Sequence, residues 1–338
     1  MKGLKLAAVT AAMVAVTGVA QAGPTFDAVK EKGFVQCGVS TGIPGFSNPD
    51  SQGKWTGIDV DTCRAIAAAM FGDAEKFKVT PLTPVQRFTA LQSGEVDVLT
   101  RNTTQTLTRD TTLGLTGTGV NFYDGQGIMV KKEIGVKSAK ELDGATVCVQ
   151  PGTTTELNLA DWFRGNKLEF QPVVVEKLDE VIRAFVAGRC DAFTTDKSQL
   201  AAVRTTFTNP DNYLILPEDF SKEPLGPMVR QGDEAWFNVV RWSLNAMIEA
   251  EEYGINSKNV NEMLKSNEPN VQRILGVTPG MGKNLGVGNE WAMNIISQVG
   301  NYGEIFERNV GQESPLKLER GLNATWRDGG LMYGWPIR

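Results

Sequence analysis

The sequence predicts an α/β protein made of two similar lobes, and three observations predict it. Short apolar runs typical of strands alternate along the chain with segments of helical periodicity, as in proteins that pack helices on sheets. This strand-and-helix pattern returns in the second half of the chain. The chain of 338 residues is also longer than one compact core usually organises, so we expect two lobes.

The first lobe begins with a predicted strand at 34–39 and a helix at 58–71. Apolar residues recur at helical spacing along one face of that helix, and Gly72 would end it. The elements expected next are a strand at 78–80, a helix at 85–93 and a strand at 96–99. Together they form one α/β unit.

Two stretches of the second half echo the first. Residues 144–149 echo 33–38, because in both a cysteine follows a glycine by four positions. Residues 185–194 echo 91–100, with a helix end, a glycine, two residues, an aspartate and a strand that ends in threonine. Chance similarity between common α/β units is the alternative, and two echoes in the same order make it the weaker one. The elements expected here are a helix at 154–163 and a strand at 172–175.

Two glycine- or proline-rich segments, 121–127 and 222–227, lie at the lobe edges and are candidates for hinges. Plain surface loops are the alternative. A long helix at 234–252 is assigned back to the first lobe, and the tail beyond it has the turns and aromatic residues of a folded segment. We therefore expect a first lobe from 23–124 and 227–338, with an extended C-terminal region, and a second lobe from 125–226.

The first 22 residues have the pattern of a secretory signal peptide. Lys2 and Lys5 are followed by an apolar segment at 6–19 and by Ala20-Gln21-Ala22, which is a typical cleavage site. The apolar segment is short for a membrane anchor, although an uncleaved anchor is the alternative. We expect an exported, soluble mature chain that begins near Gly23.

Composition excludes several classes of function. The net charge is −5 and no basic cluster is visible, so nucleic acid is not an expected partner. The chain has no histidine, which removes Ser-His-Asp and Cys-His catalysis and every histidine-dependent metal motif. The cysteines have no CxxC spacing, and we expect neither a metal nor a cofactor.

The four cysteines of an exported chain are expected to form disulfides. Spacing alone allows three connectivities. We favour Cys37–Cys63 and Cys148–Cys190, because each bond would then lie within one lobe. Four buried free thiols are the alternative.

A polar run follows the predicted strand at 96–99, and ligands bind open α/β sheets outside the carboxyl ends of their strands. Thr106 would cap a helix beginning at Leu107, which places Arg109 in the first turn near free N–H groups. Arginine, hydroxyls and free N–H groups together suit a carboxylate. On this stretch alone, an Arg109 that merely pairs with a surface acid is an equal alternative.

Two further polar clusters follow strands of the second half. Thr153 and Thr154 would place hydroxyls at a helix start. Asp196 ends a buried strand, where a carboxylate favours a cation, although it could instead cap the next helix. A carboxylate receptor in one lobe and an ammonium receptor in the other would hold an α-amino acid zwitterion and draw the lobes together.

Several motifs resemble those of the periplasmic solute-binding proteins of polar amino-acid ABC transporters. They are Gly57-Ile58-Asp59-Val60-Asp61, Asp97 with Thr104-Gln105-Thr106 and Arg109, Gly152-Thr153-Thr154 with Glu156, and Gly188-Arg189-Cys190-Asp191 with Asp196. The chain length and the segments 100–104, 156–161 and 299–304 are similar to the general L-amino-acid-binding subgroup. This resemblance implies a two-lobed periplasmic-binding-protein fold of type II, in which each lobe is a sheet flanked by helices and two hinge segments join the lobes.

The resemblance also implies roles for individual residues. Arg109 would clamp the ligand α-carboxylate, helped by Thr104 and the backbone N–H of Asn102. From the other lobe, Thr154, with Thr153 beside it, would add a contact, and Asp196 would bind the α-ammonium group.

The ligand side chain would face the loop that holds Ile43 and Phe46. Many relatives have an aromatic residue near the position of Pro84, and this sequence has none there. Phe46 or Trp55 could replace it, or the pocket could be roomier.

The resemblance implies a monomeric, non-enzymatic protein that delivers L-amino acids to the membrane permease of an ABC importer. One alternative is an enzyme on the same scaffold, a dehydratase or lytic transglycosylase, with Asp196 or Glu156 as its acid. A second is a binder of a short peptide with a free α-amino acid end. A ligand-sensing receptor domain would need a membrane span or a signalling domain, and neither is visible in the sequence.

Overall fold

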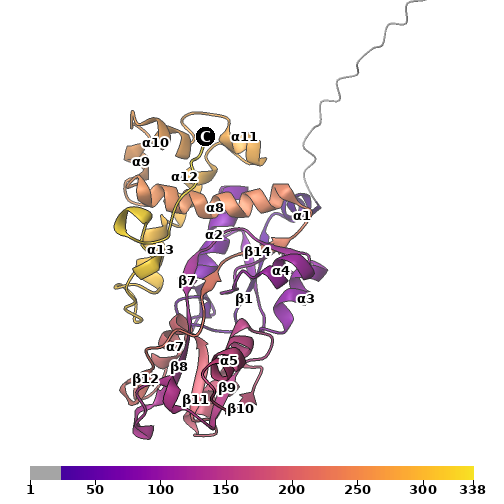
Figure 1. Cartoon of the computed structure of the whole chain (residues 1–338). Coiled ribbons are helices and arrows are strands. Elements are labelled where there is room, and N and C mark those ends of the chain that lie inside the picture. The colour runs from indigo at the N-terminus through magenta and orange to yellow at the C-terminus, as the bar shows by residue number, and fades with distance from the viewer. Residues whose placement is uncertain (1–23) are drawn as a thin grey trace, which may run out of the picture.

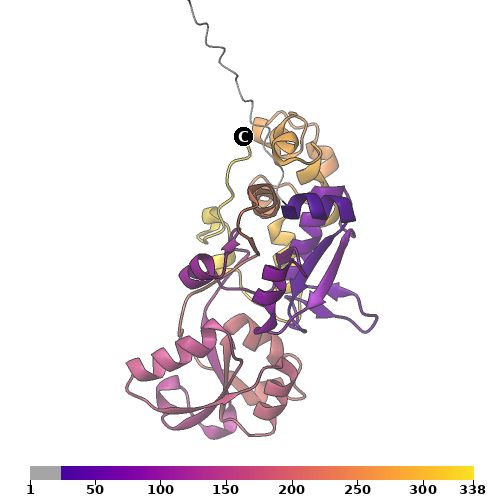
Figure 2. The same cartoon turned by 90° about the vertical axis from the view of Figure 1, so that its right-hand side faces the viewer.

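The computed structural model describes residues 24–338 and has two five-stranded sheets, one above the other in Figures 1 and 2. The predicted signal peptide lies outside the described residues. Helices cover both sheets, and the C-terminal helices gather at the end of the molecule that is remote from the second sheet. Within residues 24–338, no helix combines the length and the apolar composition needed to cross a bilayer.

The first sheet has the strand order β4-β1-β5-β14-β6. Its strands are β4 (Phe77–Pro81), β1 (Val35–Val39), β5 (Val98–Leu99), β14 (Met228–Arg230) and β6 (Leu115–Gly117). The three N-terminal strands are parallel, whereas β14 is antiparallel to both of its neighbours. A strand from late in the chain therefore lies inside a sheet whose other strands come from the first third of the chain.

Five helices accompany this sheet: α1 (Pro24–Lys32), α2 (Ile58–Phe71), α3 (Gln86–Ser93), α4 (Leu107–Thr112) and α8 (Glu234–Glu252). A small hairpin joins β1 to α2 through β2 (Asn48–Pro49) and β3 (Trp55–Thr56). Apolar residues of α1, α2, α8 and β1 form a core around Trp236, whose indole N–H donates to the carbonyl of Asp97 at 2.9 Å. The predicted helices at 58–71 and 234–252 are both present at those bounds.

The second sheet has the order β10-β9-β11-β8-β12. Its strands are β10 (Phe170–Val174), β9 (Ala145–Val149), β11 (Ala192–Asp196), β8 (Gln126–Lys131) and β12 (Tyr213–Ile215). Its α-helices are α5 (Thr154–Gly165), α6 (Leu178–Val186) and α7 (Lys197–Arg204). β1 in the first sheet and β9 in the second sheet are each parallel to both of their neighbouring strands. The two stretches that echo each other in the sequence therefore contain strands with the same pairing.

Two short strands connect the sheets. β7 (Phe122–Asp124) and β13 (Glu223–Leu225) pair antiparallel, and they fall within the two segments that the sequence offered as hinges. They are hydrogen-bonded to each other, so they are not independent surface loops. Their action as hinges stays a prediction.

The C-terminal region folds against α2 and α8. Its helices are α9 (Val260–Met263), α10 (Pro269–Ile274), α11 (Met281–Leu285), α12 (Trp291–Gln298) and α13 (Tyr302–Asn309). Trp291 and Phe306 are buried, and the Tyr302 hydroxyl donates to the carbonyl of Asn121 at 2.9 Å, just before β7. The region therefore contacts the start of one connecting strand.

Both expected disulfides are present. Cys37 in β1 is bonded to Cys63 in α2, and Cys148 in β9 is bonded to Cys190, just before β11. Each bond ties a strand of one sheet to a neighbouring element of the same lobe. Neither bond links the two sheets.

One buried acid of α8 makes stability depend on pH. Burial, together with the nearby carboxylate of Glu252, raises the pKa of Glu249 from 4.5 to about 7. An acid with a raised pKa in the folded state gives its full contribution to stability below pH 4.5, and that contribution is lost as the pH rises through about 7.

Replacing Glu249 with glutamine is therefore expected to raise the free energy of unfolding at pH 8 by about 1–3 kcal/mol. The gain should vanish near pH 4, where Glu249 is protonated. Urea unfolding of both proteins at the two pH values measures it, with the exposed Glu262→Gln as control. An equal gain at both pH values would contradict this explanation.

Candidate functional site

The candidate site lies where strand ends of both sheets meet. Arg101, Asn102 and Thr104 follow β5, Gln150 and Thr153 follow β9, and Asp196 ends β11. All six line one small cavity between the lobes. Of the residues predicted from the sequence, the structure thus brings together Asn102, Thr104, Thr153, Thr154 and Asp196.

The lobes touch across this cavity. The side chains of Thr104 and Thr154 lie 3.4 Å apart, Arg87 Nη2 donates to the carbonyl of Gly152 at 3.4 Å, and Asn102 Nδ2 donates to Gln199 Oε1 at 3.4 Å. Only about 20 Å³ remains open, room for one or two water molecules. An amino acid can enter only if the lobes separate, and these three contacts are long enough to be weak.

Asp196 is the acid most clearly placed for a cation. It is 5% exposed and sits at the N-cap position of α7, yet its side chain accepts no capping hydrogen bond. Asp124 takes over that role, because its carboxylate accepts from the N–H of Ser198 at 3.3 Å and from the Ser198 hydroxyl. The sequence left open whether Asp196 caps α7 or binds a ligand, and the capping contacts of α7 are made by Asp124 instead.

A second buried acid, Glu223, was not predicted from the sequence. It lies on β13, is 1% exposed, and accepts from the hydroxyls of Thr104 at 2.5 Å and Thr154 at 2.9 Å. Burial, and then the carboxylates of Asp124 and Glu223, raise the pKa of Asp196 well above its ordinary value. Burial also raises the pKa of Asp124 to about 6. The carboxyl groups of Asp196, Glu223 and Asp124 together strongly favour the binding of a cation.

Three arginines lie on the first-lobe side. Arg87, Arg101 and Arg109 are 3%, 5% and 7% exposed, and among residues 24–338 none of them forms an ion pair with an acid. Burial, and then the charges of the other two, hold the pKa of Arg87 well below its usual range. Burial likewise lowers the pKa of Arg101 to about 10. Buried guanidinium groups without a carboxylate partner favour an anion.

The side chain of Arg109 is held by residues of the first lobe. Its Nη1 donates to the carbonyl of Thr104 at 2.7 Å, and its guanidinium lies 5.0 Å from the ring centre of Phe88. Thr106 caps α4 as predicted, since its hydroxyl accepts from the N–H of Arg109. Arg87 and Arg101 line the cavity, whereas Arg109 lies beside it. The sequence pointed to Arg109 but not to Arg87, which lines the cavity.

Three polar atoms in the cavity wall have no hydrogen-bond partner among the described residues: Arg87 Nε, Asn102 Oδ1 and Gln199 Nε2. Buried polar groups are normally paired. These two donors and one acceptor in the wall of one cavity indicate that the cavity binds a polar ligand.

The backbone of Asn102 has a different partner from the one expected. Its N–H donates to Asp59 Oδ2 at 3.0 Å, and burial raises the pKa of Asp59 to about 7. The N–H is thus engaged inside the first lobe, and the amide side chain lines the cavity instead. The backbone here is in a left-handed conformation, with φ of 27°.

The aromatic and aliphatic residues expected near a ligand side chain lie elsewhere. Ile43 and Phe46 are each 2% exposed and pack in the core, with the Phe46 ring edge-on to Phe122 at 5.2 Å. Trp55 lies on β3 and packs against the core of the first lobe. None of the three lines the cavity.

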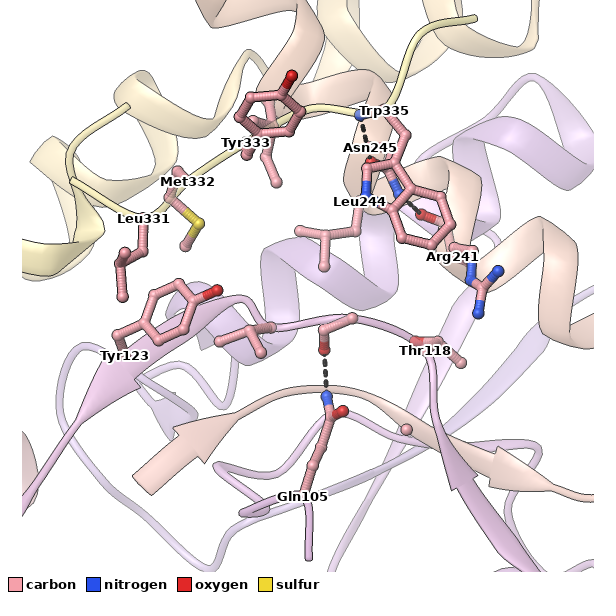
Figure 3. Close-up of a pocket in the computed structure, with 14 residues that line it drawn as sticks. Gln105, Thr118, Tyr123, Arg241, Leu244, Asn245, Leu331, Met332, Tyr333 and Trp335 are labelled. Carbon is pink, nitrogen blue, oxygen red and sulfur yellow. Dashed lines mark hydrogen bonds between the residues drawn. The ribbon is translucent and has the colours of Figure 1, made fainter. Parts of the chain in front are cut away.

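A larger cavity, of about 340 Å³, is lined in part by the segment that precedes β7 (Figure 3). Figure 3 shows Leu331, Met332 and Trp335 of the C-terminal tail above it and Gln105 below, where Gln105 donates to the carbonyl of Gly119. Within the part of the chain that the structure describes, no carboxylate lines this cavity, so it lacks the charged partner that Asp196 supplies in the smaller one. No cluster of side chains suited to a metal ion was found within residues 24–338.

Comparison with known proteins identifies the family. Residues 35–260 match the model of the bacterial extracellular solute-binding proteins, family 3. The general L-amino acid-binding periplasmic protein AapJ of Rhizobium johnstonii is 57% identical over 334 residues, 98% of each chain. The glutamate/glutamine/aspartate/asparagine-binding protein BztA of Rhodobacter capsulatus is 51% identical over 328 residues, 97% of each chain.

Solved structures agree with this assignment. A periplasmic binding protein of an ABC transporter from Brucella ovis, with glutathione bound, superposes with a TM-score of 0.91. The two sequences are 57% identical, and the match covers 93% of this chain and 99% of that one.

Proposed function

Because this chain belongs to the bacterial extracellular solute-binding proteins of family 3, we propose that it binds L-amino acids between its lobes and delivers them to the permease of an ABC importer. One observation carries the proposal. One interlobe cavity is lined both by the carboxylate of Asp196, which caps no helix, and by buried arginines that form no ion pair with an acid among residues 24–338. An α-amino acid zwitterion supplies the two missing charges at once.

In this proposal the ammonium group binds Asp196, with Glu223 and Asp124 adding negative potential. The α-carboxylate binds the group formed by Arg87, Arg101 and Arg109, with Arg109 as the clamp. The hydroxyls of Thr104 and Thr154 would turn from Glu223 to the ligand carboxylate to complete the contacts. Thr153 caps α5, with its hydroxyl accepting from the N–H of Glu156 at 3.1 Å, and it orients that wall. A ligand that bridges both lobes favours the closed arrangement over the open one.

The protein acts without catalysis in this proposal. The close relatives are named as binding proteins. An enzyme on this scaffold would need a free acid, and Asp196 is assigned to the ammonium group. Glu156 accepts from the N–H of Gly152 at 3.0 Å, at the start of α5.

We also propose where the protein works. Residues 1–22 direct export and are removed before Gly23, and the mature chain acts in the periplasm as a monomer. The relatives that are named as periplasmic and the signal-peptide pattern support this placement.

A second candidate ligand is a small peptide with a free α-amino acid end. Glutathione is bound in the Brucella ovis relative. Its glutamate is linked through the side-chain carboxyl, so the α-amino and α-carboxyl groups stay free. The same charged pair in the cavity would hold that end.

Calorimetric titration tests the proposal. The protein is unfolded with its disulfides intact, dialysed, refolded and titrated with a panel of L-amino acids. We expect several side-chain classes to bind. We expect 2-oxoglutarate, which lacks the ammonium group, and 4-aminobutyrate, which lacks the α-carboxylate, to bind at least about a hundredfold more weakly than L-glutamate. Equal binding of either analogue would overturn the zwitterion model.

A further inference from the structure

A second space opens at the seam between the lobes, beside the amino-acid cavity. It is a groove of about 360 Å³. The first lobe lines it with Thr41, Gly42, Thr83 and Gln86, and the second lobe with Lys177, Leu178, Asp179 and Ile182. The carboxylate of Asp179 is engaged by Arg183, whose Nη1 donates to it at 2.7 Å. Its volume lies within the range of small-ligand sites, in contrast to the 20 Å³ of the cavity.

The groove and the cavity share their walls. Pro84 and Arg87 line the cavity, and the adjacent residues Thr83 and Gln86 line the groove. Gln150, which lines the cavity, donates through its side chain to the carbonyl of Glu176 at 2.7 Å, one residue before Lys177. A molecule anchored in the cavity therefore needs little additional length to reach the groove.

One hydrogen bond joins the two lobes at the groove. The Thr83 hydroxyl of the first lobe donates to Glu176 Oε1 of the second lobe at 2.7 Å. This bond is shorter than the three contacts across the cavity, each of which is 3.4 Å long. A ligand tail that reaches Thr83 would compete with Glu176 for this hydroxyl, whereas a free amino acid in the cavity would not.

We propose that the groove is a subsite for the tail of an α-amino acid that is extended through its side chain by amide units and ends in a carboxylate. This inference rests on the proposed function, because the head of the ligand would occupy the zwitterion site. The chemical class is that of the γ-glutamyl peptides. The protein would then accept both free amino acids and this longer class.

The groove wall carries matching chemistry. Thr41, Thr83 and Gln86 offer hydroxyl and amide groups that can donate to and accept from a peptide amide. Leu178 and Ile182 add apolar surface. Lys177 supplies a cation, and its only ion pair within the described residues is with Glu180, at 3.6 Å. Because Lys177 is 65% exposed, that pair is weak, and a ligand carboxylate can replace it.

The test compares two ligands on one protein. L-Glutamate probes the head site alone, and S-methylglutathione probes head and tail. The methyl group removes the thiol, so that the ligand cannot exchange with the two disulfides. Thr41→Trp narrows the groove from an exposed position, and Lys177→Gln removes its cation. Ser51→Trp and Lys132→Gln are matched controls at exposed positions that do not line the groove.

We expect Thr41→Trp and Lys177→Gln each to raise the Kd of S-methylglutathione by about tenfold and to change that of L-glutamate by less than about twofold. Both controls should match the wild type. The proposal is overturned if wild-type protein binds L-glutamate but not S-methylglutathione, and in that case the amino-acid function stands. It is also overturned if the groove variants weaken both ligands equally. If neither ligand binds, the proposed function itself fails.

Discussion

Replacing Asp196 with asparagine is expected to cost about 3–5 kcal/mol of amino-acid affinity, a factor of at least a hundred in Kd. The variant keeps the size of the side chain but leaves the ligand ammonium group buried without its partner charge. The same change is expected to stabilise the unliganded protein at neutral pH, because the raised pKa of Asp196 shows that burial opposes its ionisation. An acid with a raised pKa loses its contribution to stability as the pH rises, and asparagine has no such loss.

Calorimetry and urea unfolding of one protein sample measure both effects. Lost binding together with gained stability separates a binding residue from a structural one, because removal of a structural residue would lower stability. The exposed Asp161→Asn is the matched control, since Asp161 pairs only with Arg164 at the surface of α5 within the described residues. Near-wild-type affinity of Asp196→Asn would end the proposal that this carboxylate binds the ammonium group.

Replacing Arg109 with glutamine is expected to cost about 2–4 kcal/mol of affinity, since a buried ligand carboxylate then lacks its charged partner. Arg109→Lys should recover only part of it, because an ammonium group cannot form the planar two-point contact of a guanidinium group. Arg164→Gln, at an exposed arginine, is the control. Titration of L-glutamate measures each variant.

A parallel Arg87→Gln variant decides which arginine acts as the clamp. Arg87 lines the cavity and has an unpaired Nε, whereas Arg109 lies behind Thr104. If Arg109→Gln binds normally and Arg87→Gln does not, the clamp is Arg87. The arginine group would still supply the positive charge, but the residue assignment drawn from the family motif would be wrong.

Much of the fold could be predicted because its signals are local. The helices at 58–71 and 234–252 have a regular apolar face and clear ends, and both are present at those bounds. The family resemblance, which rested on short motifs at strand ends, is confirmed by the match over residues 35–260. Strand ends can be read from a sequence because a buried strand that stops in polar residues marks one edge of a sheet.

The parts of the site that were missed depend on contacts between distant segments. Glu223 lies on a three-residue strand that has no periodicity, and its burial comes from Thr104 and Thr154 of two other segments. Arg87 lies on the short helix α3, and its contact with the carbonyl of Gly152 comes from the other lobe. The loop with Ile43 and Phe46 closes on itself, with the Ile43 N–H donating to Ser47 at 2.8 Å. Both side chains therefore turn into the core.

The position of β14 has a consequence for the order in which the protein can form during export. Every strand of the second sheet precedes β14 along the chain, and β14 must insert between β5 and β6 to complete the first sheet. The second lobe can thus mature early as a unit with more local contacts, while the N-terminal segment waits for residues 228–230. A chain that ends before β14 would contain all strands of the second sheet, but the edges of β5 and β6 in the first sheet would be unpaired. Such a chain depends on chaperones until synthesis is complete.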